Sequence, residues 1–201
     1  IDAAQLKQRL EIPPDHTVIA NIGMIRRDKG QLYFARACNQ LMDVYDNLSC
    51  IQVGEATGQT RDYKAEVVHA VQHGGHAERF HFLGYHDDIE NYLALADIVV
   101  VASIGTEAQT RLVSQAYLMK KAVVATRTGG LPEMVQHQQT GLLCEAKNAD
   151  AIAASVRQLL DDQKLRTELT GRAHAYSLQH MNIDLMMQEM VELYEETLSS
   201  A

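Results

Sequence analysis

Three cationic side chains stand close together in the segment GMIRRDKG, residues 23–30: Arg26, Arg27 and Lys29. The segment follows an apolar run and precedes a stretch with helical spacing, so it is predicted to join a strand to a helix. Cationic side chains and the amides of a helix N-terminus attract the same phosphate, which makes this loop a candidate anion site. An ordinary solvated basic loop is the alternative. The chain contains neither a P-loop pattern nor G-x-G-x-x-G, and the second absence disfavours a dinucleotide-dependent oxidoreductase.

A second candidate lies in the stretch ASIGTEAQTRLVSQAYLMKKAVVAT, residues 102–126, which reads as strand, polar loop, helix and strand. Residues 110–113 are predicted to open the helix with free backbone amides, and a phosphate could sit between them and Lys29. Glu107 is too far before the helix to cap it, so its carboxylate is available to hydroxyl groups of a ligand. Gln115, about one turn into the helix, can donate and accept. The alternative is a loop acid and a surface glutamine.

Two further glycine pairs are less specific. In TGGLPE, residues 128–133, Gly129 and Gly130 form a predicted turn, and Pro132 suits a first helical position. These glycines would let the backbone approach a ligand, although a tight turn alone also requires them. The other pair is Gly74 and Gly75, which His73 and His76 flank in the pattern H-x-x-H. No third metal ligand stands at a recognisable spacing, so no metal is expected.

The elements that must position these residues are short apolar runs alternating with helical segments. Alternation of this kind is typical of βαβ units, and it predicts an α/β fold: a Rossmann-like, doubly wound parallel sheet with helices on both faces. The second to fifth strands show little polar alternation and are expected to be buried on both faces. After residue 148 only helices are predicted, the last with an apolar stripe from Ile183 to Tyr194. The predicted strands are residues 17–24, 48–54, 79–84, 97–103, 122–126 and 141–145.

Ligands of such sheets bind outside the carboxyl ends of the strands. The segments predicted at those ends carry the unusual chemistry, including GMIRRDKG, SIGTEAQTRL and TGGLPE. We see no internal repeat or linker, and we interpret residues 1–201 as a single domain.

Composition restricts the partners and the compartment. The net charge of −8 leaves no basic face for nucleic acid. Cys38, Cys50 and Cys144 show no paired spacing and are most simply reduced core thiols of a cytoplasmic protein. No segment is apolar over the length of a membrane span. Because the chain begins at Ile1 without a methionine, we expect it to be a piece of a longer protein.

Taken together and in order, five segments resemble the donor-binding, C-terminal half of family-4 (group-1) glycosyltransferases, which have the GT-B fold. That family shows G-R-L-x-x-x-K-G, an F-x-G turn before an acidic helix, E-G-F-G-L-x-x-x-E-A-x-A-x-G-x-P-V-V-A, G-G-x-P-E-x-V and G-x-L. The corresponding segments extend over roughly residues 17–146: GMIRRDKG, FLGYHDDIENYLALAD, EAQTRLVSQAYLMKKAVVA, GGLPEMV and TGLLCE.

The resemblance implies a phosphate site built from two sides. Lys29, with Arg26 or Arg27, would neutralise the diphosphate of a nucleotide-sugar donor. The backbone amides at the start of the predicted helix would hold the diphosphate from the other side; they belong to Arg111, Leu112 and Val113.

The resemblance also implies sites for the rest of the donor. The backbone around Gly84 and Tyr85 would meet the nucleobase. Glu107 would accept hydrogen bonds from the donor sugar, and Gln115 stands where the family's second glutamate binds the ribose. The family's usual reaction is a retaining transfer without a metal or another cofactor. Negative charge then develops on the departing diphosphate, where fixed cations and amides stabilise it.

The implied partners are a nucleotide-sugar donor, a glycan or glycolipid acceptor and the protein's own N-terminal acceptor domain, which lies outside this sequence. That domain could bring the protein to the inner membrane face, and without it the last helix could self-associate. Met24 replaces a family arginine, Gln115 replaces the second glutamate, and MKKAVVA replaces the usual glycine-x-proline approach. A nucleotide-sugar-binding module without activity and an unrelated phosphate-binding domain therefore remain alternatives.

Overall fold

The computed structural model describes residues 2–105, 107, 110–181 and 183–199. In these residues, six strands form one parallel sheet in the order β3-β2-β1-β4-β5-β6. The predicted α/β class and doubly wound sheet are confirmed. The strands are β1 (Thr17–Ile22), β2 (Leu48–Val53), β3 (Phe80–Gly84), β4 (Ile98–Val101), β5 (Ala122–Thr126) and β6 (Leu142–Cys144).

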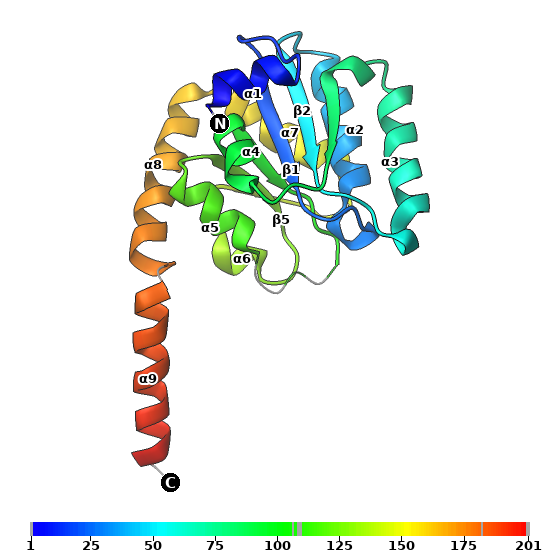
Figure 1. The fold of residues 1–201 in the computed structure, drawn as a ribbon. Coiled ribbons are helices and arrows are strands. Elements are labelled where there is room, and N and C mark those ends of the chain that lie inside the picture. The colour runs from blue at the N-terminus through cyan, green and yellow to red at the C-terminus, as the bar shows by residue number, and fades with distance from the viewer. Residues whose placement is uncertain (1, 106, 108–109, 182, 200–201) are drawn as a thin grey trace.

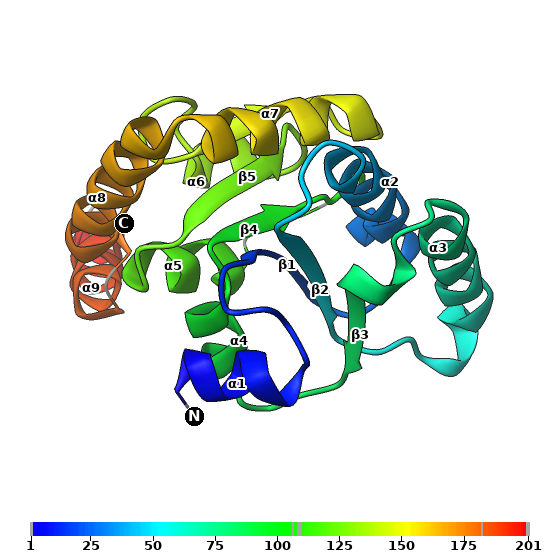
Figure 2. The same cartoon turned by 90° about the horizontal axis from the view of Figure 1, so that it is seen from above.

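Helices cover both faces of the sheet (Figure 2). The helices α2 (Gln31–Met42), α3 (Arg61–His73) and α7 (Ala149–Asp161) pack on one face. The helices α1 (Ala3–Arg9), α4 (Ile89–Leu95), α5 (Arg111–Leu118) and α6 (Leu131–Met134) pack on the other. Each strand serves both cores because successive side chains alternate between faces: Ile98 and Val100 of β4 belong to the first, Val99 and Val101 to the second.

One prediction about burial is wrong. The second to fifth strands were expected to be buried on both faces, yet in β3 only Phe80 is fully buried. β3 lies at one edge of the sheet beside β2 alone, whereas β6, which lies at the other edge and is buried, packs against α7. By contrast, every residue of β2, β4 and β5 is buried.

The chain ends in helices, as predicted. Helix α8 (Gln163–His180) packs against the body of the fold, with Leu169 in one core and Ala173 in the other. Helix α9 (Ile183–Ser199) extends away from the rest of the structure (Figure 1), and none of its described side chains is buried. Among the described helices, none combines the length and apolar character needed to span a membrane.

The order of the strands creates the site. The chain winds outward from β1 through β2 to β3, then returns to place β4 on the other side of β1. The loops that leave the carboxyl ends of β1 and β4 therefore diverge toward opposite faces, and the crevice between them is where ligands of such sheets bind. These two loops carry Lys29 and Glu107.

Candidate functional site

The loop after β1 is locked against the loop after β4. The amide of Ile104 donates to the carbonyl of Asp28 over 2.8 Å. Gly30 has a φ of +70°, and a Cβ there would lie 1.9 Å from the carbonyl oxygen of Ala102. A side chain at position 30 is thus excluded both by the backbone conformation and by space. The short 3-10 turn Arg27–Lys29 consequently presents Lys29 toward the end of β4.

Lys29 and Glu107 meet in this crevice, although 78 positions separate them in the sequence. The Nζ atom of Lys29 donates to Oε2 of Glu107 over 2.6 Å. The same oxygen accepts a hydrogen bond of 2.7 Å from the Oγ atom of Ser103. The side chain of Glu107 is 8% exposed and that of Lys29 is 31% exposed, so solvent reaches the ammonium more freely than the carboxylate.

The turn after β5 fixes the backbone of Glu107. The amide of Gly130 donates to the Glu107 carbonyl over 2.7 Å, and the Thr128 hydroxyl donates to the carbonyl of Gly105 over 2.9 Å. Gly129 has a φ of +52°, and a Cβ there would lie 2.2 Å from the carbonyl oxygen of Glu107. The sequence TGG therefore allows two loops to approach each other. Thr106, Ala108 and Gln109, which belong to the predicted loop, lie outside the described residues.

The other two cations of GMIRRDKG have different partners. Arg26 forms a two-pronged ion pair with Asp28, and this contact holds the pKa of the Asp28 carboxyl below its usual range. Arg27 pairs with Glu66 of α3 over 2.5 Å, and its guanidinium lies 4.9 Å from the centre of the Tyr63 ring. The structure thus brings Lys29 to Glu107, leaves Arg26 exposed in the same loop, and places Arg27 against α3.

The start of α5 differs from the prediction of free amides at residues 111–113. Thr110 caps the helix: its hydroxyl accepts from the Leu112 amide over 3.3 Å, and its carbonyl accepts from the Val113 amide over 3.3 Å. Among the described residues, only the Arg111 amide of these three forms no such bond. Threonine is a favoured capping residue because its side chain reaches the second or third amide of the helix. Gln115 lies about one turn into α5, as predicted, and its side chain is exposed.

A cavity of about 430 Å³ opens at the carboxyl ends of β1, β2 and β3. Gly84, with a φ of +76°, ends β3 and pairs with Gly54 across the edge of the cavity. Tyr85 is 73% exposed at its rim, and its hydroxyl donates to Asp87. The residues that line the cavity are mostly apolar or glycine: Ile22, Gly23, Met24, Val53, Gly54, Glu55, Ala56, Thr57, Tyr85, His86 and Ile89.

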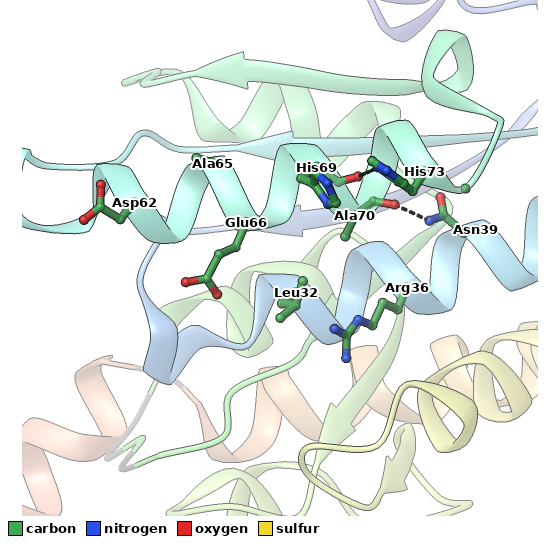
Figure 3. A pocket seen from close by; sticks show the side chains of 10 residues that line it. Leu32, Arg36, Asn39, Asp62, Ala65, Glu66, His69, Ala70 and His73 are labelled. Carbon is green, nitrogen blue, oxygen red and sulfur yellow. Dashed lines mark hydrogen bonds between the residues drawn. The ribbon is translucent and has the colours of Figure 1, made fainter.

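A larger groove, of about 780 Å³, runs along α2 and α3 between these two helices (Figure 3). His69 and His73 stack on α3 with ring centres 3.8 Å apart, and Arg36 of α2 projects from the facing helix. His76, the other histidine of the H-x-x-H pattern, bonds Asp43 over 2.8 Å. In the part of the chain that the structure describes, no three His, Cys, Asp or Glu side chains are placed to hold a metal ion.

The comparisons with known proteins decide the family. Residues 16–162 match the sequence profile described as glycosyl transferases group 1. The chain belongs to this family. The lipopolysaccharide 1,2-N-acetylglucosaminetransferase of Salmonella typhimurium is 30% identical over 172 residues, which are 79% of this chain and 43% of that enzyme. The family resemblance inferred from the five motifs is thus confirmed, and an unrelated phosphate-binding domain is set aside.

Solved structures of group 1 and related glycosyltransferases share the fold. Anabaena Alr3699/HepE in complex with UDP superposes with a TM-score of 0.90 at 27% identity, over all of this chain and 53% of that one. The C-terminal domain of the group 1 protein LpcC from Francisella tularensis superposes with a TM-score of 0.82 at 29% identity, over 90% of this chain and 93% of that domain. The chain therefore spans about half the length of full-length relatives.

Two polar side chains of this group 1 chain were not singled out from the sequence. Ser103 is buried and bonds Glu107; its only signal was its place at the end of an apolar strand, four residues before the acid. Glu55 lines the cavity and pairs with Lys64 over 2.5 Å, which lowers the pKa of its carboxyl. Nothing in the sequence alone distinguished it from an ordinary surface glutamate.

Proposed function

We propose that this chain, residues 1–201, is the donor-binding domain of a glycosyltransferase that takes its sugar from a nucleotide-diphosphate sugar. The observation that carries the proposal is the Lys29–Glu107 pair, a cation and a carboxylate at the crevice where the strand order reverses. The cavity beside Tyr85 opens at the same edge of the sheet. Structures of Anabaena HepE with UDP and with UDP-glucose support this class of donor.

In this proposal the diphosphate lies between the loop after β1 and the start of α5. Lys29 and Arg26 supply positive charge, and the Arg111 amide supplies a donor from the opposite side. Leu112 and Val113 complete the first turn of α5, whose dipole favours an anion. Arg27 contributes only if it leaves Glu66 and Tyr63, so we assign it the weakest role.

The nucleoside then occupies the cavity of about 430 Å³ at the ends of β1, β2 and β3. The backbone of Gly84 and Tyr85 meets the base, because Gly84 has no side chain to obstruct a ligand and Tyr85 lies at the rim of the cavity. Gln115 bonds the ribose. Its amide can donate and accept, whereas the glutamate usual in the family can only accept when ionised.

The sugar lies against Glu107, and the reaction is a transfer with retention that needs no metal. Negative charge develops on the departing diphosphate, and Lys29 and Arg26 stabilise it because donor binding has placed their charges beside it before the reaction starts. An N-terminal domain of the full-length protein supplies the acceptor site, and the acceptor is a glycan or glycolipid of the cell surface. The enzyme works in the cytoplasm, peripherally at the inner membrane face. The Salmonella relative, named for lipopolysaccharide, supports this acceptor class.

The first test is binding by the 201-residue chain. The unfolding temperature is measured with UDP, GDP or ADP added. A domain that binds one of these nucleotides unfolds at a higher temperature in its presence, and a domain that binds none does not. At a hundred times its dissociation constant the preferred nucleotide should stabilise the fold by about 2.7 kcal/mol. If none of the three shifts the unfolding temperature, the proposal fails.

The second test separates an enzyme from a binding module. In the full-length protein, Glu107→Ala should depress sugar turnover much more than it depresses binding of the sugar-free nucleotide. A full-length protein that binds a nucleotide-sugar but transfers nothing to water or to any glycolipid acceptor would be a binding module, consistent with its departures at Met24 and Gln115.

A further inference from the structure

One oxygen of Glu107 has two hydrogen-bond donors of very different character. Lys29 reaches Oε2 from a loop and is 31% exposed, whereas Ser103 reaches the same oxygen from the end of β4 and is buried. We propose that Ser103 is a positioning residue that keeps Glu107 paired when the donor diphosphate takes Lys29 away. The inference rests on the function proposed above, since it assigns Lys29 to the diphosphate.

The Lys29–Glu107 pair opposes such an exchange. The ammonium of Lys29 lies 2.6 Å from a carboxylate that is only 8% exposed, so a move of Lys29 toward a phosphate lengthens or breaks this contact. If Lys29 moved and nothing else bonded Oε2, a nearly buried charge would be left without a partner, which opposes the movement. A second donor on the same oxygen reduces that penalty, and Ser103 is this donor.

Ser103 is held by the sheet and not by the ligand site. Its carbonyl accepts a hydrogen bond of 2.5 Å from Thr126, at the end of the neighbouring strand β5. The backbone of Glu107 is fixed separately by the amide of Gly130. The Ser103–Glu107 bond therefore remains in place when the loop after β1 adjusts, and the carboxylate keeps its orientation toward the sugar.

The alternative is that Ser103 only fills the end of the core. The two explanations differ in whether the effect of removing Ser103 depends on the charge of Glu107. If Ser103 compensates the carboxylate after Lys29 leaves, its removal weakens diphosphate binding only while Glu107 is charged. If Ser103 acts through packing alone, its removal has the same effect whether position 107 carries a carboxylate or an amide.

A double-mutant cycle on the 201-residue chain tests this, with calorimetry of whichever of UDP, GDP or ADP the wild-type chain binds. Ser103→Ala should weaken binding about three- to tenfold in the wild-type background, and less than about twofold in the Glu107→Gln background. Ser103→Cys, which keeps the size and a weak donor, should fall between serine and alanine. Ser177→Ala is the matched control: this buried serine bonds the His174 carbonyl on α8, and its loss should leave affinity unchanged.

Equal losses in both backgrounds would overturn the role of Ser103 while leaving the nucleotide site intact. So would an unchanged affinity in Ser103→Ala. If Ser103→Ala does not fold, by thermal unfolding, the comparison of Ser103→Cys in the two backgrounds decides in the same way. If the wild-type chain binds no nucleoside diphosphate at all, the proposed function fails and the inference fails with it.

Discussion

Replacement of Lys29 by alanine is expected to have two separable effects, on ligand binding and on stability. If the ammonium makes one charge-assisted hydrogen bond to a diphosphate, its loss removes about 1.5–3 kcal/mol of binding free energy. The affinity for a nucleoside diphosphate should therefore fall by about ten- to a hundredfold. Calorimetric titration of the 201-residue chain measures this directly.

The effect of Lys29→Ala on stability depends on Glu107, the partner that remains. Removing one member of a fully buried ion pair costs about 3–5 kcal/mol, but Lys29 is 31% exposed and Ser103 still bonds Glu107. We therefore expect the free energy of unfolding to fall by only about 1–2 kcal/mol, because solvent screens the exposed partner. For a domain of this size that lowers the unfolding temperature by about 2–8 °C, and the protein stays folded.

Lys164→Ala is the control for loss of a lysine as such. Lys164 is 87% exposed on α8 and lies 4.0 Å from Glu168, so neither affinity nor stability should change measurably. The reasoning about Lys29 is refuted if its alanine variant binds the nucleotide as tightly as the wild type. A loss of affinity without any change in unfolding temperature would refute the structural pairing with Glu107 instead.

Further changes test the other parts of the site. Gly129→Ala should cost more than about 1 kcal/mol of stability in thermal unfolding and weaken nucleotide-sugar binding, because φ is +52° and the new Cβ would displace the Glu107 carbonyl. Gln115→Glu restores the family's usual residue and should retain nucleotide binding by calorimetry; complete loss would remove position 115 from the ribose. Arg27→Ala should alter nucleotide affinity less than threefold, since its pair with Glu66 is exposed. Truncation after residue 181 should leave the unfolding temperature unchanged, because α9 buries nothing, and should abolish any self-association seen by sedimentation.

The elements of the fold could be predicted from the sequence because each has a local signal. The run VVV at the end of β4 and the helical spacing of Phe34, Ala37 and Leu41 depend on neighbours a few positions away. The strand limits differ from the structure by one or two residues, mainly where the apolar run continues into the loop. The exposure of β3 was mispredicted because it depends on the order of the strands, which no local pattern contains.

The sequence indicated which residues could form the candidate site, but not which of them would pair. Arg26, Arg27 and Lys29 share one loop in the sequence, and their common charge suggested a common ligand. In the structure each finds a different carboxylate, and two of these lie far along the chain: Glu66 for Arg27 and Glu107 for Lys29. Such partners are set by which helix or strand packs beside the loop, and that information appears only once the sheet is assembled.

The sheet order also explains why Lys29, and not its neighbours, reaches the acid. The loop after β1 leaves the sheet beside β4, and Gly30 brings its backbone within contact of Ala102 at the end of β4. The residue just before this contact is Lys29, so its side chain is the one delivered to the loop that carries Glu107. Arg27, two positions earlier in the same 3-10 turn, lies on the side of α3 instead. Loss of one residue from this turn would therefore bring Asp28, an acid, to the position before Gly30 and leave Glu107 without this cation.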